Sequence, residues 1–190
     1  MTDAAPAMFA KGSTVHGTLE YLGAVHGPGT RARVIGALPP QLRARLEAVT
    51  PTGELDYDDL VVLWAVADAA LSPTVPDWSE QAGAFSIAHR GSEMYGGLLR
   101  KSTPDEFLGQ SVSLFQLFYH PGNIVPVEHG AKSAVLRLVG FEPRTPLFCR
   151  RQVGGLSKAI DIAGGASSEV RHVRCSLEGD AFCEWSLAWK

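Results

Sequence analysis

Apolar residues recur with the period of an α-helix over the first two thirds of the chain. They lie three or four positions apart, which places them on one face of a helix. Helix boundaries are also recognisable. Asp56 precedes a strongly apolar run, and Thr103-Pro104-Asp105-Glu106 forms a capping box with proline at the first helical position. The pattern predicts helices over residues 14–26, 30–37, 57–70, 78–99 and 104–119, and a short helix that begins at Pro40.

The period changes to two after residue 122, which is typical of β-strands. We expect one hairpin over residues 123–128 and 133–141, a helix over 146–163, and a second hairpin over 168–177 and 181–189. Helices followed by two hairpins indicate an α+β fold. The prediction is one domain over residues 1–190, with a helical lobe over residues 1–75. Its antiparallel sheet of about four strands would pack with the N-terminal helices and with the helix between the hairpins.

Two of the predicted helices carry distinctive surfaces. Ala84, Ala88 and Gly91 follow one another at helical spacing, and such small residues let another backbone come close. A helix crossing within the chain is the favoured interpretation of this stripe, and a subunit contact is the alternative. The second surface is dense and mostly aromatic, and consists of Phe107, Leu108, Val112, Phe115, Phe118 and Tyr119.

Composition excludes several classes of protein. Hydrophobic residues make up 45% of the 190 residues and the net charge is −3, so no overall positive field favours nucleic acid. The most apolar run, residues 60–71, contains Asp68 and is shorter than the roughly twenty residues that span a bilayer. The first eight residues lack the basic start and apolar run of a secretory signal. We therefore expect a soluble cytoplasmic protein without a membrane span.

The three cysteines fall in the last forty or so residues, as Cys149, Cys175 and Cys183, and His172 precedes Cys175 by three positions. An odd number of cysteines argues against a secreted disulfide framework. Thiolates and an imidazole are the ligands of structural zinc, and four of them close a tetrahedral shell. A regular strand would turn His172 and Cys175 to opposite faces, so a metal site here requires a bulge. Three buried cysteines acting as small apolar side chains, or a redox pair, are the alternatives.

The ending from His172 to Trp185 resembles the closing hairpin of 4-vinyl reductase-type domains, which carry a Cys, a Gly-Asp turn, and a second Cys before Glu and an aromatic residue. That resemblance covers roughly residues 78–190. Lys11-Gly12-Ser13 and the segment from Leu38 to Leu42 resemble a family of paralogous myxobacterial proteins. These groups share a fold with haem NO-binding domains and with subunits of a Golgi transport tethering complex. The resemblance implies an α+β domain that is usually dimeric and holds an apolar pocket.

Two site assignments follow from the resemblance. The aromatic surface would form the pocket wall, with Phe107, Val112, Phe115, Phe118 and Tyr119 as its lining. Phenol-sensing transcription activators hold zinc with a Cys, a Glu-x-x-Cys and a Cys eight residues later. Cys149, Cys175 and Cys183 are similar in layout, while His172 stands where those proteins have Glu. Imidazole is an acceptable substitute because it binds zinc well.

Other chemistries find no support in the residues. The Tyr-x-Ser-x-Arg motif of haem NO-binding domains is missing, and His89 and His120 have the setting of surface histidines, so we expect no haem. Neither a Gly-x-Ser-x-Gly elbow nor a His-Glu-x-x-His pair occurs, and no phosphate-binding loop is recognisable. Three arginines near Cys149 form a small basic patch, interpreted as solvated charge: Arg144, Arg150 and Arg151.

The leading hypothesis is therefore a non-enzymatic sensor or adaptor domain. A pocket of ~300 Å³ or more behind the aromatic surface would bind a small hydrophobic molecule. A homodimer would pass occupancy on to a separate signalling protein. A structural interaction module, similar to the tethering-complex subunits, is the alternative and predicts a flat apolar surface in place of a cavity. An enzyme of vinyl-group reduction ranks third, because no nucleotide site or proton donor supports it.

Overall fold

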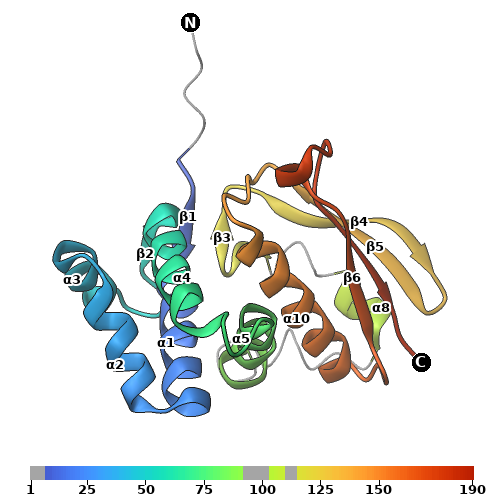
Figure 1. Cartoon of the computed structure of the whole chain (residues 1–190). Helices are drawn as coiled ribbons and strands as arrows, with labels where there is room; N and C mark the ends of the chain where they lie inside the picture. The colour runs from blue at the N-terminus through green and yellow to red at the C-terminus, as the bar shows by residue number, and fades with distance from the viewer. Residues whose placement is uncertain (1–6, 92–102, 110–114) are drawn as a thin grey trace, which may run out of the picture.

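The fold of the computed structural model is α+β, as the period of the apolar residues predicted. The structure describes residues 7–91, 103–109 and 115–190. The N-terminal helices lie to one side, the larger sheet lies to the other, and the helix α10 runs between them (Figure 1). None of the described helices is long and apolar enough to cross a membrane.

Four helices form the N-terminal lobe, close to their predicted bounds: α1 (Gly12–His26), α2 (Pro28–Ala37), α3 (Pro40–Ala48) and α4 (Tyr57–Leu71). The side chain of Asp56 accepts a hydrogen bond from the backbone N–H of Asp58, so it caps α4 as expected. Trp64 is fully buried and donates its indole N–H to the hydroxyl of Thr18, 3.2 Å away. This bond fixes α4 against α1 inside the core.

A small sheet, β2-β1-β3, was not predicted. Its antiparallel strands are β1 (Phe9–Lys11), β2 (Glu54–Asp56) and β3 (Tyr119–His120). Strands of two or three residues are too short to show an alternating pattern, which explains the omission. The sheet also corrects the predicted helix over residues 104–119, because Tyr119 is extended and pairs with Ala10.

The larger sheet has four antiparallel strands in the order β4-β5-β7-β6. They are β4 (Asn123–Gly130), β5 (Ser133–Val139), β6 (Glu169–Arg174) and β7 (Glu184–Ala188). Alternate residues of the central strands are buried, including Leu136 and its cross-strand partner Trp185, neither of which is exposed. The helix α10 (Pro146–Ile162) joins the two hairpins, where the sequence placed it.

The long helix predicted over residues 78–99 differs in the structure. The α-helix α5 (Trp78–Ser86) gives way to a π-helical turn, η1 (Ile87–Gly91), and residues 92–99 lie outside the described residues. The helix start predicted at Thr103 is confirmed, because the Thr103 hydroxyl accepts a hydrogen bond from the N–H of Glu106 at the start of α8 (Pro104–Leu108), which is one of the two bonds of a capping box. Val112 of the aromatic surface also lies outside the described residues.

The helices α5 and α10 cross at glycines. A methyl group on Gly83 would overlap the carbonyl oxygen of Arg151, and one on Gly154 would overlap the carbonyl oxygen of Glu80. Ala84 also lies against Gly154 at this crossing. The small residues of α5 thus serve a close packing within the chain, the interpretation favoured above, although Gly83 and not Ala84 is the point of nearest approach.

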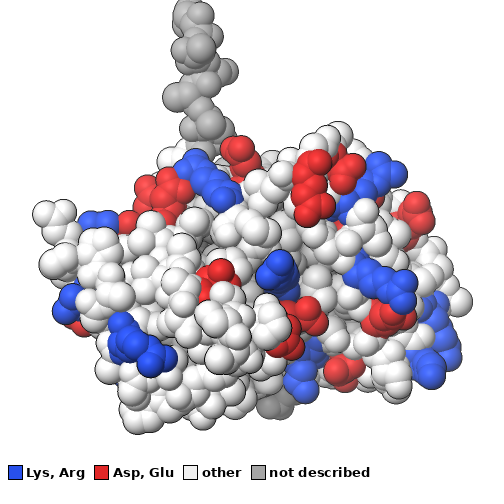
Figure 2. Space-filling model, in the orientation of Figure 1, with Lys and Arg blue, Asp and Glu red and all other residues white. Residues whose placement is uncertain are grey.

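Charged side chains of both signs are interspersed over the face of the molecule seen in Figure 2. This distribution agrees with the small net charge of −3. The described part of this face therefore carries no extended patch of a single sign.

Replacing Gly154 by alanine should separate α5 from α10 and lower the free energy of unfolding by about 3 kcal/mol, because the added methyl group has no room. Gly155→Ala is the matched control. Its methyl group would meet Ile87 at an ordinary 3.6 Å, and alanine favours a helix over glycine by about 1 kcal/mol. Urea unfolding followed by circular dichroism measures both. Equal stability of the two variants would contradict the close crossing.

Candidate functional site

The structure brings the predicted ligand set together. One atom each of Cys149, His172, Cys175 and Cys183 lies within 4.8 Å of the corresponding atoms of the other three. The sulfur atoms of Cys149 and Cys183 are 3.9 Å apart. All three cysteines are buried and free, and His172 is half-buried. Cys149 thus meets three residues that follow it by more than twenty positions in the chain.

Local backbone geometry makes this convergence possible. The pairing of β6 with β7 shifts between His172 and Arg174. A regular strand would turn the side chains of His172 and Cys175 to opposite faces of the sheet, and this bulge lets both lie on the same side. After Cys175 the chain makes a short turn that ends at Gly179, whose φ of 101° requires glycine. The carboxylate of Asp180 then accepts a hydrogen bond from the N–H of Cys175 at 2.8 Å. Cys183 re-enters the core opposite Cys149.

The surroundings of Cys183 favour a thiolate. The N–H and the hydroxyl of Ser176 each lie 3.3 Å from its sulfur atom. The thiol of Cys149, the nearby imidazole of His172 and the two donors of Ser176 lower the pKa of Cys183. The same pairing raises the pKa of Cys149, because its proton is held between the two sulfur atoms. Thiolate is the form in which cysteine binds metals.

The imidazole of His172 is oriented by packing. Its ring stacks on Trp185 with centroids 5.1 Å apart, and its buried Nε2 has no hydrogen-bond partner among the described residues. An imidazole nitrogen without a partner beside three sulfur atoms fits a metal ion at this point. Four protein ligands would leave no open position, so a metal here would be structural.

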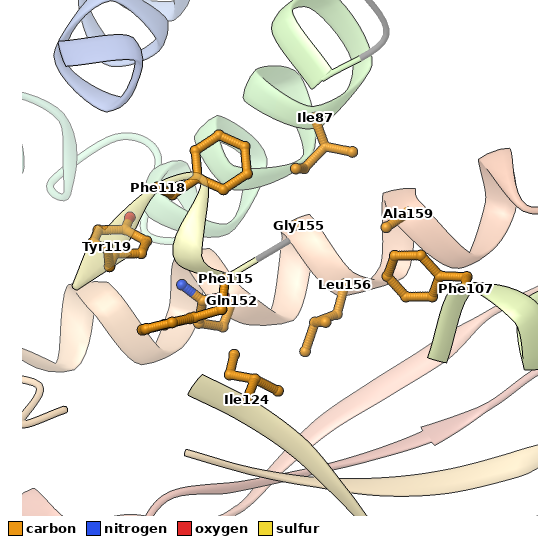
Figure 3. A pocket seen from close by; sticks show the side chains of 10 residues that line it. All are labelled: Ile87, Phe107, Phe115, Phe118, Tyr119, Ile124, Gln152, Gly155, Leu156 and Ala159. Atoms are coloured by element: carbon orange, nitrogen blue, oxygen red, sulfur yellow. The ribbon is translucent and has the colours of Figure 1, made fainter. Parts of the chain in front are cut away.

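An apolar cavity of about 70 Å³ lies between α10 and the described residues of the aromatic surface. Figure 3 shows the side chains around it, which come from η1, α8, β3, β4, α10 and the segment directly before β3. Phe107, Phe115, Phe118 and Tyr119 of the predicted pocket wall line it, while Val112 lies outside the described residues. The other lining residues are Ile87, Ile124, Gln152, Gly155, Leu156 and Ala159. The cavity is smaller than the ~300 Å³ expected for a pocket at this place.

A second cavity of about 60 Å³ adjoins the first and is more polar. Arg151 lines it together with Ser13, Thr14 and Ser86. The interpretation of Arg151 as solvated charge is wrong, since its exposed fraction is 5%, while the neighbouring Arg150 and Arg144 are exposed. The signal in the sequence was its spacing: Arg151 follows the inward Leu147 by four positions and precedes Gly154 by three.

Comparison with solved structures places the fold. The Fe(II) unliganded H-NOX protein from K. algicida superposes with a TM-score of 0.73 over 95% of this chain and 96% of that chain, at 14% identity. The chain has the H-NOX fold. A mutant of the T. tengcongensis H-NOX protein gives a TM-score of 0.68 at 15% identity, over 95% of this chain and 97% of that one. No protein-family model and no curated protein matches the sequence.

These neighbours overturn the expectation that haem is excluded. One similar structure, with a TM-score of 0.66, concerns haem redox potential and porphyrin distortion, and another, at 0.67, concerns haem distortion in the H-NOX family. The H-NOX fold therefore accommodates haem in these proteins, and the missing motif is not sufficient to exclude haem. The macrocycle would require the cavity to widen.

The two histidines considered for haem lie away from this lining. His89 is exposed and stacks on Phe85, with ring centroids 3.9 Å apart. The Nε2 of His120 lies 3.1 Å from the carboxylate of Glu54. His89 has the surface setting that the sequence indicated, whereas His120 is half-buried and its Nε2 is a buried atom.

The turn that positions Cys175 can be tested through Asp180. Asp180→Ala removes the acceptor of the Cys175 N–H and should lower the free energy of unfolding by about 1 kcal/mol. Asp180→Asn retains a side-chain oxygen and should keep most of that stability. Chemical denaturation compares the two variants. An alanine variant as stable as the wild type would contradict a stabilising role of this hydrogen bond.

Proposed function

We propose that this protein is a non-enzymatic domain that binds a small, largely apolar molecule and passes its occupancy to a partner protein. The observation that carries the proposal is the aromatic cavity against α10, which adjoins a polar one. Concave apolar sites with a few polar groups are the usual form of ligand pockets. The H-NOX fold supports the proposal, since it is a fold in which other proteins hold haem.

A ligand in this cavity would act on several elements at once. The lining residues come from η1, α8, β3, β4, α10 and the segment directly before β3, and β3 belongs to the same small sheet as β1 and β2 (Figure 1). Displacing Phe118 or Tyr119 would therefore move the edge of the N-terminal lobe. A homodimer or a separate signalling protein in contact with that lobe would register the change. The three free thiols favour a reducing compartment such as the cytoplasm.

Zinc at Cys149, His172, Cys175 and Cys183 forms the second part of the proposal. The ion would anchor the closing hairpin to the first turn of α10 and so hold one end of the cavity wall. This ligand set supports a relationship to the 4-vinyl reductase-type domains and the phenol-sensing activators, whose hairpin the sequence resembles. Residues 76–190 would then be the ligand-binding core.

A partner surface is available on the N-terminal lobe. An open groove between α2 and α4 is lined mainly by small apolar side chains, among them Val34, Val61, Val62 and Ala65. Val62 is 39% exposed. This groove is the observation that favours the second candidate function, an interaction module similar to the tethering-complex subunits.

Ligand binding can be measured on the full chain with benzene and 1-hexanol as probes. We expect saturable changes in the NMR signals of the cavity residues Ile124, Leu156 and Ala159. Leu156→Trp should abolish them by filling the space, whereas Val173→Phe, at an exposed position, should leave them unchanged. Titration with haemin, monitored through the haemin absorption band, tests whether the chain binds a ligand of the size of haem. Absence of saturable binding for all three probes would refute a ligand-binding function.

Metal content gives the test of the zinc site. Protein purified with zinc in the medium should contain about one zinc ion per chain by elemental analysis, and a chelator should lower its melting temperature. Cys175→Ser should lose the metal, while Ser176→Ala, which changes a neighbouring residue that is not a ligand, should retain it. Equal zinc content in the two variants would rule out the proposed ligand set.

A further inference from the structure

Arg151 is a buried cation without a counterion among the described residues. The residue is 5% exposed, and no carboxylate of the described chain lies within ion-pair distance of its guanidinium. Nη2 makes a long hydrogen bond of 3.4 Å to the hydroxyl of Ser86, and Nη1 has no partner in the described chain. A guanidinium carries five N–H donors and remains charged in proteins. Buried charges are normally paired, so this arrangement points to an anionic group that is not part of the described chain.

Nearby groups partly stabilise the cation but do not neutralise it. The ring of Trp64 has its centroid 4.9 Å from the guanidinium carbon, which is a cation–π contact. The phenol of Tyr119 interacts with the guanidinium, yet burial raises the pKa of this phenol to about 12, so it is neutral near pH 7. The positive charge therefore remains available to a ligand.

Three further features of the same cavity favour an anion. The hydroxyl of Ser13 is buried and has no hydrogen-bond partner among the described residues. Ser13 and Thr14 lie in the first turn of α1, so the positive end of its helix dipole lies at this cavity, while the backbone N–H groups of Gly12 and Ser13 already donate to the carbonyl oxygens of Gly53 and Pro51. Arg151 is the one charged side chain in the described lining of the cavity. A single negative charge matches this site better than a phosphate dianion.

The polar cavity and the apolar cavity are neighbours and share part of their lining. Both are lined by the same five residues of η1, β3 and α10, or of the turn before β3: Ile87, Phe118, Tyr119, Gln152 and Gly155. These shared side chains lie between the two cavities, so a molecule with an apolar body in the first cavity would reach Arg151 with a polar end by displacing them. The small volumes of about 70 and 60 Å³ indicate a short molecule.

We infer that the ligand is a small monocarboxylic acid, whose carboxylate binds to the Arg151 guanidinium and the Ser13 hydroxyl while its apolar chain fills the cavity between α10 and Phe107, Phe115 and Ile124. This inference rests on the proposed ligand-binding function and specifies its chemical class. The planar guanidinium suits a carboxylate, because the two groups form parallel hydrogen bonds. No covalent step is involved.

The test compares hexanoate with 1-hexanol, which have the same chain length and differ in the charge of the end group. Both are titrated into the full chain and followed by NMR signals of the cavity residues. Hexanoate should bind roughly tenfold to a hundredfold more tightly than hexanol, the range expected for a charge-assisted hydrogen bond. Arg151→Met should remove this preference and leave hexanol binding intact. Arg150→Met, an exposed neighbour on the same helix, should preserve it.

Ser13→Ala provides a second variant in which the buried arginine is untouched, should Arg151→Met fail to fold. It should weaken hexanoate binding several-fold without affecting hexanol. Equal binding of hexanol and hexanoate to the wild type would overturn the carboxylate inference while leaving the ligand-binding function in place. Binding of neither would defeat both. Inorganic phosphate or chloride that competes at equal concentration would overturn it in favour of a free-anion site. If Arg151→Met weakened the binding of haemin but not that of hexanoate, the inference of a small carboxylic acid would be overturned in favour of a haem propionate at this site.

Discussion

The close crossing of α5 and α10 is the constraint on which the candidate sites depend. Gly83 and Gly154 bring the two backbones together so closely that a methyl group on either would overlap the other helix. The buried side chains of α10 therefore lie close to the N-terminal lobe, where the guanidinium of Arg151 lies over the ring of Trp64 in α4. Interiors of such density transmit small displacements, because packed elements have few intermediate arrangements.

One helix carries parts of every site described. Cys149, in the first turn of α10, faces the closing hairpin. Arg151 and Gln152 follow at the polar cavity, and Leu156 and Ala159 line the apolar one. A metal ion at the cysteines would fix the N-terminal end of this helix, while a ligand would act on its middle. This arrangement would give the proposed metal ion a structural role beside the proposed ligand cavity.

The likeness to H-NOX proteins lies in the course of the backbone, at 14–16% identity among the structures compared. The chemistry of a site depends on its side chains, and a fold can host different ones. In the described residues of this chain, the cavity wall combines aromatic rings with a buried guanidinium, and a set of cysteines and a histidine stands at the hairpin. These side chains, and not the shared backbone, are the basis of the proposed ligand class.

The sequence by itself determined the order of the helices and hairpins, the α+β class, the caps at Asp56 and Thr103, and the four residues that meet at the hairpin. These features follow from local periodicity, from capping chemistry, and from the grouping of His172 with two of the three cysteines near the end of the chain. Only the tertiary structure decided the small sheet, the end of α5 at Ser86, the size of the cavity and the burial of Arg151. Each of these depends on which distant segment packs against a residue. An arginine in a helix looks the same in sequence whether it meets water or the ring of Trp64, and that difference arises only where two helices cross.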